Sequence, residues 1–84
     1  MISALGLGMT DSDIDNAILA VVEASWKKVA MIIAKTADRL GRDLPEGDER
    51  YHLIARRIEA LVRDGKLIAQ GDITRWRHSE VRRP

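Results

Sequence analysis

The 84-residue sequence contains no cysteine, no phenylalanine and no long apolar run. Without cysteine the chain can form neither a disulfide nor a thiolate nucleophile nor a cysteine-ligated zinc site. No segment approaches the roughly 18 consecutive apolar residues of a membrane-spanning helix, and the opening MISALGLGM lacks the basic flank of a signal peptide. We therefore expect a cytoplasmic protein with no membrane partner, in which residues 1–9 form a flexible leader.

Aromatic residues are also scarce, because Trp26, Tyr51 and Trp76 are the only ones. Hydrophobic residues make up 45% of the chain and charged residues 32%, a balance typical of a globular domain. A chain this short buries only about 60% of the surface that its unfolded form exposes, so most apolar positions are needed for the core. We expect a single domain over residues 10–84, with the three aromatic side chains as its anchors.

Charge is unevenly distributed, although the net charge is only +1. Residues 1–48 hold five Lys or Arg against eight Asp or Glu, giving 5 − 8 = −3, and residues 49–84 hold nine against five, giving 9 − 5 = +4. An anionic partner would therefore bind the second half. The alternative is that these cations are ordinary solvated surface.

Two segments in the first half have apolar residues at helical spacing. The first covers about residues 11–24, and its start is marked by Thr10 and Asp13, which have the spacing of a capping box. The second runs from about Ser25 to Gly41, a glycine that suits the end of a helix. A short strand near Ser25 is compatible with the pattern but is not specified by it.

A third helix is predicted after the connector RDLPEGD, in which Leu44 is expected to point inward. Asp48 is placed to cap this helix and Gly65 to end it. Its predicted core face consists of Tyr51, Ile54, Ala55, Ile58, Leu61 and Val62.

The stretch GKLIAQGDITRWR, residues 65–77, predicts a hairpin with a two-residue turn at Gly71-Asp72. In that register the pairs are Ala69 with Thr74, Leu67 with Trp76, Ile68 with Arg75, and Lys66 with Arg77. One face of the hairpin would then close the core, and the other would be basic.

The predicted fold class is mainly α with a small β-hairpin, in the order helix, helix, connector, helix, hairpin. The run LVRDGKL resembles the junction between the third helix and the wing in winged helix-turn-helix proteins. This resemblance implies DNA binding, with the third helix in the major groove and the wing against the backbone or the minor groove. More narrowly, residues 10–83 are similar to an uncharacterised bacterial family found at protein C-termini. The matching positions are Trp26, Arg57, Leu61, Gly65, Leu67, Gly71 and the SEVR of residues 79–82.

Catalytic motifs are missing from the sequence. His52 and His78 lie on separate predicted elements without metal-ligand spacing, and no serine lies in a nucleophile-elbow motif. We therefore expect no enzyme activity, no metal, no cofactor and no small-molecule substrate.

The predicted contacts to double-stranded DNA are His52, Arg56, Arg63, Lys66, Arg75 and Arg77. Two cations facing each other across the wing, Lys66 and Arg77, favour an anionic partner because their repulsion is otherwise uncompensated. Against it, Glu59 can form a ladder with Arg56 and Arg63, and Glu80 can neutralise the wing arginines.

A protein-interaction or homodimerisation module is the alternative function. In the predicted register Ile68 and Ile73 project from the basic face of the wing, and Leu53 lies outside the core stripe of the third helix. Apolar residues among cations suit a protein partner or a second copy better than phosphate. Leu53 is equally well explained by packing under the leader or the connector.

Overall fold

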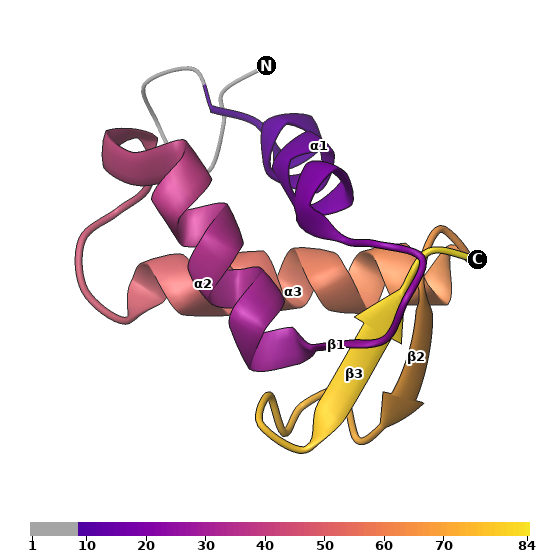
Figure 1. Ribbon diagram of the computed structural model, residues 1–84. Coiled ribbons are helices and arrows are strands. Elements are labelled where there is room, and N and C mark those ends of the chain that lie inside the picture. The colour runs from indigo at the N-terminus through magenta and orange to yellow at the C-terminus, as the bar shows by residue number, and fades with distance from the viewer. Residues whose placement is uncertain (1–8) are drawn as a thin grey trace.

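The computed structural model describes residues 9–84 (Figure 1); residues 1–8, where most of the expected leader lies, are outside the described residues. The elements are α1 (Asp11–Val21), β1 (Lys27–Lys28), α2 (Val29–Leu40), the 3-10 turn η1 (Gly41–Asp43), α3 (Glu49–Arg63), β2 (Ile68–Gly71) and β3 (Ser79–Arg82). Three helices and a small antiparallel sheet thus form a mainly helical fold with a winged-helix-like layout, as predicted.

The first helix begins as the sequence indicated. The Thr10 backbone N–H donates to Asp13 Oδ2 at 2.9 Å, and the Asp13 N–H donates to Thr10 Oγ1 at 3.2 Å, which completes the capping box. The second helix begins at Val29 and not near Ser25. The reason is tertiary, because Lys27 and Lys28 pair with β3 as a short strand before the helix starts.

The predicted hairpin turn is wrong. β2 pairs with β3 in the register Ile68 to Arg82, Ala69 to Val81, Gln70 to Glu80 and Gly71 to Ser79, so a seven-residue loop, 72–78, replaces the two-residue turn. β2 pairs with Ser79–Arg82 and not with residues 73–77 because β3 is the central strand of the sheet, in the order β1-β3-β2. Ser79 and Val81 of β3 are buried. Lys66 and Arg77 therefore do not face each other, and the repulsion argument for an anionic partner no longer applies.

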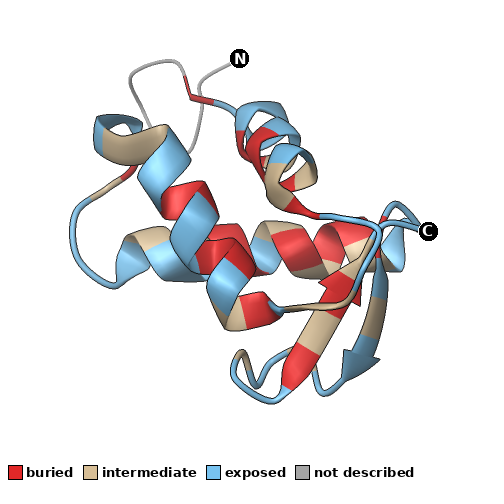
Figure 2. Cartoon of the chain, in the orientation of Figure 1, coloured by how far each residue is buried: buried red, intermediate tan, exposed pale blue. Residues whose placement is uncertain are grey.

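The core is aliphatic and lies where the three helices meet the sheet (Figure 2). Its largest fully buried side chains are Ile14, Ile18, Ile32, Ile54, Ile58, Leu61 and Leu67. Met9 and the connector's Leu44 are buried with them. Met9, which was expected in the leader, therefore belongs to the packed domain.

The aromatic residues are not core anchors. Tyr51 is 38% exposed and lines a hollow of about 460 Å³ beside the connector. Trp76 is half-buried at the edge of the core, and Trp26 is half-buried under the guanidinium group of Arg82. Helical spacing places Tyr51 on the core stripe of α3, but spacing alone cannot show how far along α3 the neighbouring elements cover that stripe. In the structure the buried part of α3 begins one turn later, at Ile54.

Candidate nucleic-acid interface

The loop between β2 and β3 is ordered by its own hydrogen bonds. Asp72 Oδ1 accepts from the Thr74 N–H at 3.0 Å and from Thr74 Oγ1 at 2.7 Å. These two bonds, the hydroxyl bond first, lower the pKa of Asp72, and the nearby charge of Arg75 acts in the same direction. Two turns follow, because the Arg75 N–H donates to the Asp72 carbonyl and the His78 N–H to the Arg75 carbonyl, each at 2.9 Å.

This loop does not extend into solvent as a free wing but lies against the starts of α2 and α3. The Trp76 carbonyl accepts from the Ala30 N–H at 2.9 Å, which satisfies a free donor at the start of α2. The Trp76 ring meets the His52 ring edge-on, with centroids 5.2 Å apart and planes at 60°. Lys28 Nζ donates to the Arg77 carbonyl at 3.2 Å. The loop is thus held by both helices.

The six predicted contact residues fall into two groups, with His52, Arg56, Arg75 and Arg77 in one and Arg63 and Lys66 in the other. His52 and Arg56 lie one turn apart on α3, and the loop that touches His52 carries Arg75 and Arg77 on either side of Trp76. All four are exposed. Together with Lys28 they form what we call the basic cluster.

Arg63 and Lys66 lie apart from the basic cluster. Arg63 is the last residue of α3, seven residues and thus about 10 Å along the helix axis from Arg56. Lys66 follows it, and its N–H donates to the Leu61 carbonyl at 2.9 Å. The structure therefore does not join all six residues in one compact site.

The acidic residues expected to neutralise these cations have other partners. Arg56 Nη2 lies 3.9 Å from Glu49 Oε1, and not beside Glu59, so the predicted ladder on α3 does not form. Glu80 accepts a hydrogen bond from Gln70 instead of pairing with the loop. Within residues 9–84, Arg63, Lys66, Arg75 and Arg77 have no carboxylate within 4 Å. The cations of the loop are therefore available to an external anion.

Comparison with known proteins identifies one relationship. The chain is 36% identical over 78 residues to a protein named "Uncharacterized protein YjeN" of Escherichia coli (strain K12), a match that covers 87% of this chain and 73% of that one. The chain belongs to the YjeN family. No family model and no solved structure matches it. The expected relationship to an uncharacterised bacterial protein is thus confirmed, whereas membership of the winged-helix superfamily remains a prediction.

Some arginines of this YjeN family member are structural, although sequence reasoning gave them no partner. Arg57 donates from Nε to Asp15 Oδ1 at 2.8 Å and from Nη2 to Asp15 Oδ2 at 2.9 Å. Arg50 donates to the carbonyls of Pro45 and Gly41, at 2.9 and 3.1 Å, and so holds the connector on α3. A signal for Arg57 was available, since it lies beside the apolar stripe of α3 and not opposite it.

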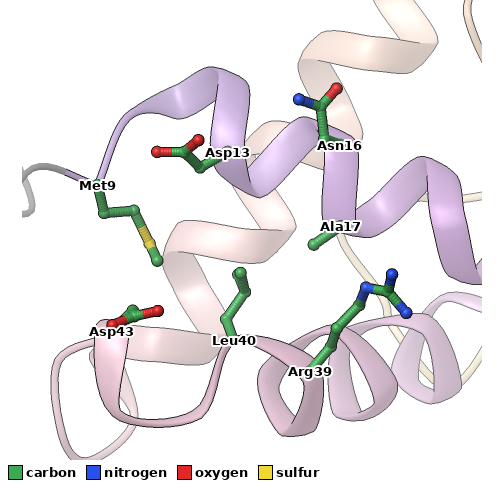
Figure 3. A pocket seen from close by; sticks show the side chains of 7 residues that line it. All are labelled: Met9, Asp13, Asn16, Ala17, Arg39, Leu40 and Asp43. Atoms are coloured by element: carbon green, nitrogen blue, oxygen red, sulfur yellow. The ribbon is translucent and has the colours of Figure 1, made fainter.

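A hollow of about 530 Å³ lies between α1 and the end of α2 in this YjeN family member (Figure 3). It is lined by Met9, Asp13, Asn16, Ala17, Arg39, Leu40 and Asp43. Asp13 is already engaged in the capping box. Over residues 9–84 there is no group of three or more His, Cys, Asp or Glu side chains that could hold a metal ion, and no helix there is long and apolar enough to cross a membrane.

Proposed function

We propose that this protein is a non-catalytic winged-helix domain that binds double-stranded DNA through the basic cluster. The observation that carries the proposal is the contact between Trp76 and His52, because it brings the loop segment that contains Arg75 and Arg77 to the exposed side of α3. In a helix-turn-helix arrangement the third helix enters the major groove and the wing contacts the backbone. His52 and Arg56 would then face base edges, and Arg75 and Arg77 would neutralise phosphates.

The electrostatics support this arrangement. The basic cluster contains four permanent cations, Lys28, Arg56, Arg75 and Arg77, and within residues 9–84 only Arg56 among them has a carboxylate within 4 Å. Because Arg56 and Glu49 are 66% and 56% exposed, their contact at 3.9 Å is weak and an incoming phosphate can replace it. Trp76 is committed to His52 and the core, so stacking on an unpaired base is not the proposed mode.

The test is fluorescence anisotropy with a mixed-sequence duplex, measured over a range of salt concentrations. The variant Arg75→Gln/Arg77→Gln should weaken binding about tenfold or more and reduce the slope of log K against log salt by about 2, since each phosphate contact contributes about 0.9. The matched control, Arg39→Gln/Arg42→Gln, removes the same charge from the last turn of α2 and from η1, and should change affinity less than twofold.

A third double variant, Arg63→Gln/Lys66→Gln, measures how far the DNA-binding surface of the protein extends along α3. A loss smaller than that of the loop pair is expected, because these residues lie beyond the basic cluster. Wild-type protein that fails to bind at low salt, or a control pair that weakens binding as much as the loop pair, would contradict the proposal.

A further inference from the structure

Strand β2 lies at the edge of the sheet, and within residues 9–84 no strand pairs with its outer side. An open edge presents unpaired N–H and C=O groups that another chain can join, and proteins usually block it with a proline, a bulge or a charge on the strand. β2 has the sequence IAQG and pairs with β3 without interruption over its four residues. It therefore carries none of these blocking features.

The solvent face beside this edge combines one apolar side chain, Ile68, with the polar side chains of Gln70, Glu80 and Arg82. Ile68 is 36% exposed, one of three large apolar side chains that are exposed in the described part of the chain. Its neighbour on β3 is Arg82, whose guanidinium carbon lies 5.0 Å from the centre of the Trp26 ring. A row of Trp26, Arg82 and Ile68 thus crosses the sheet and ends at the open edge.

The charges that flank β2 have opposite signs and complement each other in a symmetric pair. Lys66 lies two residues before the strand and Asp72 directly after it; both are exposed, and neither has an ion-pair partner within 4 Å in residues 9–84. In an antiparallel pair with its two-fold axis at Ala69, the end of β2 next to Lys66 in each copy lies beside the end next to Asp72 in the other. A second copy of this chain supplies both the strand and the matching charges in this order.

We propose that the β2 edge is a homodimer interface, in which two copies pair antiparallel about Ala69 to form one six-stranded sheet. The two exposed Ile68 side chains lie diagonally across the new strand pair, where they cover each other from solvent. Because each copy contributes only one short strand, the dimer is weak and reversible. It does not depend on the proposed DNA binding.

Sedimentation velocity over a concentration series up to about 1 mM tests this interface, in the range where weak contacts of this size are populated. The sedimentation coefficient of the wild type should rise with concentration, and Ile68→Lys should abolish the rise. Met31→Lys is the matched control, since Met31 on α2 is 43% exposed and lies outside the interface. A wild type that stays monomeric, or an Ile68→Lys variant that associates like the wild type, overturns the proposal.

A charge exchange tests the register. The symmetric dimer has two contacts between Lys66 of one copy and Asp72 of the other. In a Lys66→Asp dimer both contacts would be Asp against Asp, and in an Asp72→Lys dimer both would be Lys against Lys. Each variant alone should therefore be monomeric. An equimolar mixture should associate again, because both contacts are then between opposite charges. Circular dichroism establishes that each variant is folded. A mixture of two folded variants that does not associate contradicts the pairing about Ala69.

Discussion

Arg57 of α3 donates two parallel hydrogen bonds of 2.8 and 2.9 Å to Asp15 of α1. These two residues are 42 positions apart in the sequence, and their pairing joins the two helices. The side chains are 26% and 20% exposed, so solvent screens the pair only partly. The hydrogen bonds that Arg57 donates to Asp15 raise the pKa of Arg57; burial lowers it, and the negative charges of Asp15 and Asp11 raise it further. The contact therefore fixes the angle between the first and third helices.

Asp15→Asn should lower the free energy of unfolding by about 1–2 kcal/mol, because it removes the charge from a half-buried bidentate pair. Asp11→Asn is the control, since Asp11 is 68% exposed and its carboxylate lies 3.6 Å from Arg57 Nη1; its effect should stay within about 0.5 kcal/mol. Urea denaturation of both variants measures the difference. Equal losses would show that the bidentate geometry is unimportant.

Thr36 and Ser79 are the two buried polar residues of the described chain, and they should respond oppositely to loss of the hydroxyl. Thr36 Oγ1 has no hydrogen-bond partner within residues 9–84, so Thr36→Val should raise the free energy of unfolding by about 1 kcal/mol. Ser79 Oγ donates to the Arg75 carbonyl at 2.8 Å, so Ser79→Ala should lower it by about 1 kcal/mol. Thermal and urea unfolding would test both; destabilisation by Thr36→Val would reveal a partner for its hydroxyl.

Alanine substitutions at Gly71 and Gly65 distinguish the cost of backbone strain from the cost of a steric clash. Both have positive φ, +81° and +79°, which costs an alanine about 1 kcal/mol. A Cβ at Gly71 would also lie 2.6 Å from the His78 carbonyl oxygen, whereas one at Gly65 would meet nothing within 4 Å. Gly71→Ala should therefore be clearly more destabilising than Gly65→Ala, and it should shift the NMR signals of residues 72–78. Equal losses of stability would mean that the loop moves aside without cost.

Asp72 provides a pH-dependent readout of the loop. Its pKa is lowered below the ordinary 3.8, so its hydrogen bonds stabilise the folded loop above that pH, and this contribution is lost as the pH falls through the folded-state value. An NMR titration should give a midpoint below 3.8, and Thr74→Val should raise it, because the hydroxyl bond is the largest cause of the shift. The midpoint should still stay below 3.8, since the Thr74 N–H remains. An unchanged midpoint in Thr74→Val would contradict the assigned cause.

The helices could be predicted closely from the sequence because their signals are local. The capping box at Thr10 and the spacing of Ile54, Ile58 and Leu61 depend on residues within a turn or two of each other. The hairpin could not be predicted in this way. Gly71-Asp72 has the sequence of a tight turn, but β2 pairs with the more distant segment Ser79–Arg82. Pairing with Ser79–Arg82 buries Val81 against the helices and lets β3 also pair with β1.

For the candidate site, the sequence determined which residue types are present and on which side of α3 His52 and Arg56 lie. It could not show which carboxylate an arginine binds, since Asp15, the partner of Arg57, lies 42 residues away in the sequence. Only the tertiary structure placed Trp76, the residue between Arg75 and Arg77, against His52, and left Arg63 and Lys66 apart. The physical reason is that helix spacing is set along the chain, whereas strand register and ion pairing are decided by contacts between distant segments.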